Sequence, residues 1–199
     1  METFTPISPE NLGPSSEPIL NLKHYAPGTS VIYSLHGRCT VLAVETKKMG
    51  DESILFYKLE IQKTGSSHTT KQEPAIWLPV ASAKERGLRL PMYLEIAEAA
   101  LALLASREYY FQTNEPWSTV HPKLEACIRN EGGQGLAKVV SFLFVLKRKQ
   151  VILPTETAKF YETVNKLLLR ELSLALGESI RVLEEKINKS LKHKLIPDN

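Results

Sequence analysis

Cysteine is scarce in this chain, which has only Cys39 and Cys127 among its 199 residues. The two residues lie far apart in the sequence, in segments that we expect to fold as separate domains. Small secreted folds that depend on disulfides carry several closely spaced cysteines. The cysteine usage therefore excludes a disulfide framework and favours a reducing, cytoplasmic location.

The sequence also lacks a hydrophobic run of membrane-spanning length. The apolar segment 101–105 is bounded by Glu98 and Arg107, whereas a transmembrane helix needs roughly 20 apolar residues. The first residues, Met1-Glu2-Thr3, have neither the positive start nor the apolar core of a signal peptide. We therefore expect no association with a membrane.

Groups of residues that support catalysis or bind metal are missing as well. The run Gly132-Gly133-Gln134-Gly135 has no Lys-Ser/Thr pair of a phosphate loop and indicates a turn between helices. No metal-ligand spacing relates the cysteines to the histidines, which are His24, His36, His68, His121 and His193. The sequence thus predicts no catalytic residue, no metal site and no cofactor, and the protein is not expected to be an enzyme.

No strong excess of either charge is present. The chain has 25 Lys and Arg against 22 Asp and Glu, which gives a formal net charge of +3 at pH 7. A balance this mild permits contact with nucleic acid but does not require it. Charge alone therefore does not identify a partner.

Proline and serine are frequent in the first 23 residues, which contain Pro6, Pro9, Pro14 and Pro18. A segment of this composition buries too little apolar surface to fold and indicates a flexible leader. Two interpretations stay open: a tail that binds a partner, or an extension without a binding role.

Short strand patterns follow between Tyr25 and Arg89. They are rich in β-branched and aromatic residues and are separated by turn signals at Pro27-Gly28, His36-Gly37 and Gly50-Asp51. The expected strands cover residues 30–33, 40–44, 54–61 and 75–78. Their spacing predicts a small, strongly bent β-barrel filled by its own side chains, which leaves no room for a substrate. This half of the chain is predicted to offer a binding surface.

Helical periodicity runs from Pro91 onward, with breaks expected at Gly132-Gly133 and Gly177. Apolar residues recur at helical spacing over residues 94–104, 117–129, 135–149, 154–172 and 180–191. We therefore predict an α+β protein with three parts. These are a leader over residues 1–23, a β-barrel domain over residues 24–90, and a compact all-α domain of four or five helices over residues 91–196.

Several motifs, taken in their order along the chain, resemble a known family. Those of the strand segment are Val31-Ile32-Tyr33, His36-Gly37, Val44-Glu45-Thr46, Phe56-Tyr57, Leu78-Pro79-Val80 and Gly87-Leu88-Arg89. Those of the helical segment are Trp117-Ser118, Leu136-Ala137-Lys138-Val139-Val140 and Glu171-Leu172-Ser173-Leu174-Ala175. Together they cover Tyr25 to Gly177 and resemble the CarD/CdnL family of bacterial RNA-polymerase-binding transcription regulators.

This resemblance implies a Tudor-like barrel that docks on the β subunit of bacterial RNA polymerase. It places the contact on the edge formed by Lys47, Lys48, Met49 and the strand around Trp77. The family commonly has a basic residue at the position of Lys47, which is retained, and another at Trp77, where this chain has an aromatic residue. Trp77 either anchors the interface from outside, as exposed tryptophans do, or points into the barrel. Pairing of this edge with a strand of the partner is a further expectation.

The resemblance also implies a second partner, promoter DNA, for the helical half. Trp117 matches the tryptophan that the family places against the minor groove at the upstream edge of the transcription bubble. An aromatic wedge at a distorted base step compensates for lost stacking and favours the melted state. The alternative is that Trp117 closes the core of the helical bundle. The other candidate DNA contacts are Lys123, Arg129, Lys147, Arg148 and Lys149.

The chain departs from the family directly after this tryptophan. Where relatives have arginines that hold phosphates, it has Thr119, Val120 and His121. Because phosphate contacts supply most of the affinity for DNA, we expect weak binding that is independent of base sequence. Docking on polymerase would then supply the local concentration that DNA contact needs.

Three functional hypotheses follow. The first is a monomeric, cytoplasmic and nucleoid-associated regulator that binds the polymerase β subunit and stabilises the promoter open complex. The second is a divergent relative that docks on polymerase, has lost DNA contact and acts through another protein. The third is an adaptor, built of a barrel and helices, that is unrelated to transcription.

Overall fold

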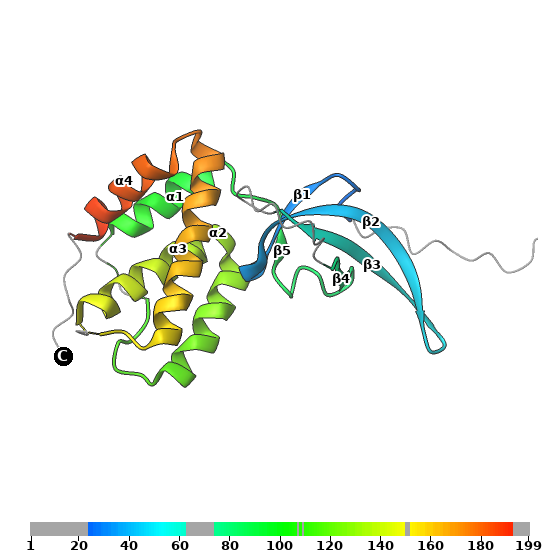
Figure 1. The fold of residues 1–199 in the computed structure, drawn as a ribbon, viewed down its shortest axis with the longest axis horizontal. Helices are drawn as coiled ribbons and strands as arrows, with labels where there is room; N and C mark the ends of the chain where they lie inside the picture. Colours follow the sequence, from blue (N-terminus) through cyan, green and yellow to red (C-terminus); the bar gives the residue numbers. More distant parts are fainter. Residues whose placement is uncertain (1–23, 63–73, 107, 109, 150–151, 193–199) are drawn as a thin grey trace, which may run out of the picture.

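The computed structural model describes residues 24–62, 74–106, 108, 110–149 and 152–192. The predicted leader and residues 193–196 of the predicted helical domain lie outside the described residues. Within these residues, an antiparallel sheet comes first and four α-helices follow (Figure 1). The prediction of an α+β protein is confirmed.

In the described part of the chain the sheet has five strands, of which β2 and β3 form a long hairpin. The strands are β1 (Ser30–Tyr33), β2 (Gly37–Met49), β3 (Glu52–Ile61), β4 (Ile76–Pro79) and β5 (Leu88–Arg89). Their order is β4-β3-β2-β1-β5, with all neighbours antiparallel. The hairpin turns at Gly50, whose φ of +66° favours glycine. The β2–β3 register shifts between Val41 and Ala43, as it does at a β-bulge.

The sheet is open, so the prediction of a closed barrel is wrong. β4 and β5 are its two edges, and in the described part of the chain neither strand pairs with the other. Both are short. The turn segment that joins them places Val80 and Ala83 in the apolar core of the sheet. In the described residues the two edge strands are therefore joined by a turn segment that packs on the core, and not by strand pairing.

The helices are α1 (Leu94–Ala105), α2 (Trp117–Lys149), α3 (Thr155–Leu176) and α4 (Ile180–Lys192). The predicted break at Gly132-Gly133 appears as a kink within α2, where Gly132 has φ 59° and ψ −121°. A Cβ at Gly132 would lie 3.0 Å from Cδ and Nε of Arg89. Both the positive φ and the close approach of Arg89 therefore require glycine at this position. α3 ends at Gly177, which has a left-handed conformation, as predicted for a helix break.

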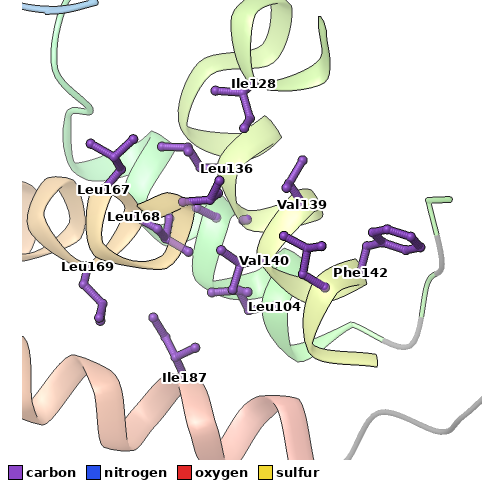
Figure 2. Packing of buried hydrophobic residues seen from close by; sticks show 14 of the residues in the cluster. Leu104, Ile128, Leu136, Val139, Val140, Phe142, Leu167, Leu168, Leu169 and Ile187 are labelled. Atoms are coloured by element: carbon purple, nitrogen blue, oxygen red, sulfur yellow. The ribbon is translucent and has the colours of Figure 1, made fainter. Parts of the chain in front are cut away.

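All four helices contribute to one hydrophobic core. Leu104 of α1, Val140 of α2, Leu168 of α3 and Ile187 of α4 converge within it, as Figure 2 shows. The buried residues of α1, α3 and α4 recur mostly every three or four residues, so each of these helices turns an apolar stripe toward the centre. Residues 135–146 of α2 are buried on nearly every side, which makes this arm the central helix of the core. Burying one such side chain contributes about 1.5–3 kcal/mol before the entropy of ordering is counted.

The sheet and the helices are joined by a buried ion pair. Arg89 of β5 donates two hydrogen bonds to the carboxylate of Glu171 in α3, at 2.7 Å and 2.6 Å. The side chain of Glu171 is 3% exposed and that of Arg89 is 21% exposed. Leu35, in the short helix η1 (Ser34–His36), also packs against the helical core. The sheet is thus held in a defined orientation on α3.

Candidate interaction surfaces

The two faces of the sheet differ. Alternate residues of β3, which are Leu55, Tyr57, Leu59 and Ile61, pack into the core of the sheet. Since neighbouring side chains of a strand point to opposite faces, Phe56 and Lys58 lie on the outer face.

Trp77 lies on this outer face as well. Its neighbours in β4, Ile76 and Leu78, both pack into the core, so the alternation directs Trp77 outward. It is half-buried and stands opposite Lys58 of β3 in the register. Of the two orientations that the sequence left open, the structure shows the outward one.

Two lysines cover the Trp77 ring. Nζ of Lys47 lies 3.0 Å from the ring centroid and Nζ of Lys58 lies 5.4 Å from it. The three residues come from the neighbouring strands β2, β3 and β4. Cation–π contacts of this kind contribute about 0.5–1 kcal/mol at exposed sites. The sheet thus joins Lys47 to Trp77, two of the predicted polymerase contacts.

Phe56 completes this group, which we call the sheet surface: Lys47, Phe56, Lys58, Trp77 and Pro79. Phe56 is buried although it lies on the outer face, between Glu45 and Pro79 of the flanking strands. Neither Phe56 nor Lys58 was predicted as a contact. The alternation within residues 54–61 is the sequence signal that could have assigned both to the face opposite the core.

Lys48 and Met49 lie at the end of β2, beside the hairpin turn. Both are exposed. β4 pairs only with residues 56–59 of β3, so the end of the hairpin projects past it, as Figure 1 shows. Alternation places Met49 on the same face as Lys47 and places Lys48 on the opposite face. The four predicted polymerase contacts are therefore close together but do not share one face.

Trp117 begins α2 and packs against α3. Its ring lies 5.7 Å, edge to face, from that of Phe160 and 5.0 Å from that of His121. The tryptophan is half-buried against the helical core, as the alternative of a lid on the bundle requires. It also borders an open hollow together with Glu156 and Lys159. Part of the indole is therefore open to a partner.

The basic end of α2 lies near Trp117. Nζ of Lys147 is 5.8 Å from the ring of Tyr161, the residue after Phe160 in α3. Nζ of Lys149 donates to Oγ1 of Thr113 at 3.0 Å, in the segment that leads into Trp117. Arg148, between these two lysines, donates from Nη1 to the backbone oxygen of Lys192 at the end of α4, at 3.4 Å. We call the following group the helix-end surface: Trp117, Lys147, Arg148, Lys149, Phe160 and Tyr161. Folding brings the predicted tryptophan and the predicted basic triplet to the same end of the bundle.

The other two predicted DNA contacts are less well placed. Nζ of Lys123 lies 2.6 Å from Oε2 of Glu115, so a carboxylate compensates its charge locally. Arg129 borders a hollow with Tyr33 and Ser34 at the junction with the sheet. It lies roughly 18 Å along α2 from Trp117, at a rise of 1.5 Å per residue. Arg129 therefore does not belong to the helix-end surface.

The two cysteines form no reactive centre. Burial raises the pKa of the Cys39 thiol to about 11. Burial, together with the nearby Glu131 carboxylate, raises the pKa of the Cys127 thiol to about 12. Within the described ranges, no three His, Cys, Asp or Glu side chains are grouped so as to hold a metal ion. None of the described helices is long and apolar enough to cross a bilayer.

Comparison of this sequence with protein-family models and with curated proteins gave no match.

Proposed function

We propose that this protein is a non-enzymatic bacterial transcription regulator. It docks on the β subunit of RNA polymerase through the sheet surface and contacts promoter DNA through the helix-end surface. The observation on which the proposal chiefly depends is the position of Trp77. It lies outward on an edge strand, with Nζ of Lys47 over its ring. In this proposal the open, bent sheet is a Tudor-like module and the protein acts as a monomer on the nucleoid in the cytoplasm.

The docking step uses both backbone and side chains. β4 is an edge of the sheet, so within the described residues one side of its backbone has no strand partner. An edge of this kind can accept a strand from another protein. Trp77 supplies a large apolar contact beside that edge, and aromatic residues of this kind contribute strongly to protein interfaces. Lys47 and Lys58 favour an acidic partner surface.

The DNA step uses charge first and the indole second. Lys147, Arg148 and Lys149 can contact phosphates without reading bases, which fixes a position on the duplex. The exposed part of Trp117 then contacts the minor groove where the base step is distorted and stabilises the melted state. The Arg89–Glu171 pair holds the two parts of the protein together, so docking of the sheet sets the position of the helices.

Two measurements test the proposal. Purified protein is mixed with bacterial core polymerase, and retention on an affinity resin is measured. A promoter complex is then footprinted with and without the protein. We expect association with polymerase and added protection at the upstream edge of the bubble. Failure to bind any bacterial core polymerase contradicts the docking step and, with it, the whole proposal.

Two observations favour the second candidate, a regulator that docks but does not contact DNA. Trp117 packs against Phe160, and the Glu115 carboxylate compensates the charge of Lys123. Both residues therefore already have contacts within the protein, which makes them less available to DNA. Binding to polymerase with an unchanged footprint would support this second function.

A further inference from the structure

A groove separates the sheet from α3 at their junction, away from both surfaces described above. Its cavity volume is about 260 Å³. Its apolar lining comes from both parts of the protein and includes Ile32, Leu167, Leu174 and Ile180. Leu174 is 55% exposed and Ile180 is 46% exposed. Large apolar side chains that remain this open beside a cavity mark a binding surface.

The floor of the groove is fixed by a close approach of α3 to the sheet. A Cβ at Gly37 would lie 2.8 Å from Cδ2 of Leu167, and Gly37 has a φ of +79°. Only glycine satisfies both conditions. The groove is therefore part of the folded junction between the sheet and the helices.

The rim of the groove is positively charged. It includes the exposed side chains of Arg38 and Arg170. Arg38 donates from Nε to Oγ of Ser30 at 2.7 Å. Among the described residues, neither guanidinium has a carboxylate partner. The Glu171 carboxylate also borders the groove, but Arg89 neutralises it. An occupant should therefore combine apolar side chains with carboxylates.

We propose that the leader of this same chain, residues 1–23, binds the groove. The leader carries Glu2, Glu10 and Glu17 against one basic side chain, Lys23. Apolar residues follow its acids closely, as Leu12 follows Glu10 and Ile19 follows Glu17. These closely spaced carboxylates and apolar side chains match the groove, which has an apolar floor and two guanidinium groups on its rim. The inference does not depend on the proposed polymerase function.

The leader is long enough to reach the groove. Tyr25, just past the leader, donates its backbone N–H to Oη of Tyr57, which is opposite Val44 in the sheet. Val44 and Arg38 both belong to β2, and Arg38 lies roughly 20 Å from Val44 at about 3.3 Å per residue. The chain from Leu12 to Tyr25 spans up to roughly 43 Å when extended. A tether of this length gives an effective concentration on the order of millimolar, so a weak contact suffices.

The test uses the full chain with a nitroxide on Ser8→Cys and measures paramagnetic broadening of backbone amides by NMR. Wild-type protein treated with the same nitroxide reagent is the labelling control, because it shows how far the native thiols of Cys39 and Cys127 are labelled. We expect strong broadening at Gly37 and Leu174. R38E/R170E should abolish it, and adding E10R/E17R to that variant should restore it. Both arginines are exposed, so the fold should persist, and K84E/K189E serves as the matched control.

Three outcomes would overturn the proposal. One is an absence of broadening at the groove, or broadening that R38E/R170E leaves unchanged. Another is broadening centred on the sheet surface or the helix-end surface. The third comes from mixing spin-labelled chains with unlabelled, ¹⁵N-enriched chains: broadening in that sample means that the leader occupies the groove of a second copy. Salt at about 1 M, where the Debye length is near 3 Å, should weaken a charge-assisted contact.

Discussion

Arg89 and Glu171 form a bidentate ion pair between β5 and α3. Gly87-Leu88-Arg89 and Glu171-Leu172-Ser173 are distant in the sequence and meet at the junction of the sheet and the helices. The ion pair gives both segments a structural role. They hold the two parts of the protein in one orientation.

Arg89→Ala should destabilise the protein by about 3–5 kcal/mol, because it leaves the buried Glu171 carboxylate without a partner. Urea unfolding followed by circular dichroism measures the loss. Arg181→Ala is the matched control, since Arg181 and Glu185 form a pair that is 90% and 71% exposed and such pairs contribute less than about 1 kcal/mol. Equal losses in the two variants would show that the buried pair does not stabilise the junction.

Trp77→Ala and Lys47→Glu should each weaken binding to core polymerase by at least about tenfold, or about 1.4 kcal/mol. Both remove part of the sheet surface without removing a residue of the sheet core. Fluorescence anisotropy with labelled protein gives the affinity, and thermal unfolding checks that the fold persists. Lys84→Glu, an exposed charge reversal between β4 and β5, should leave the affinity unchanged. Wild-type affinity in both test variants would remove this face from the interface.

Trp117→Ala should shorten the lifetime of the promoter open complex by about tenfold, a barrier change of about 1.4 kcal/mol, while polymerase binding stays normal. The lifetime is measured after a competitor challenge. Phe160→Leu separates the two roles of the indole, because it disturbs the packing of Trp117 but leaves the indole in place. Should Phe160→Leu shorten the lifetime as much as Trp117→Ala, the effect would come from lost packing and not from contact with DNA.

Replacing Lys147, Arg148 and Lys149 by alanine should reduce the salt dependence of promoter binding. Each lost phosphate contact lowers the slope of log K against log salt by about 0.9. Lys123→Ala should change the slope little, because Glu115 already compensates its charge. The measurement is a titration of promoter complexes at several salt concentrations. An unchanged slope in the triple variant would exclude these residues as phosphate contacts.

Local patterns predicted most of the secondary structure. Alternation in residues 54–61 corresponds to β3, and helical spacing on either side of Gly132-Gly133 corresponds to the two arms of α2. Such elements are predictable because side-chain periodicity and the conformational freedom of glycine act within a few residues. The selection of Trp77, Lys47 and Trp117 as contacts follows only from the resemblance of short motifs to a known family, not from periodicity.

The direction of each side chain and the grouping of distant residues depended on tertiary packing. Val80 and Ala83, between the two edge strands, pack into the core of the open sheet, which local strand signals do not encode. Trp77 faces outward because Ile76 and Leu78 are taken into the core. Trp117 and Lys147 lie at the same end of the bundle because both contact α3, at Phe160 and Tyr161, and this arrangement of distant segments has no periodicity along the chain.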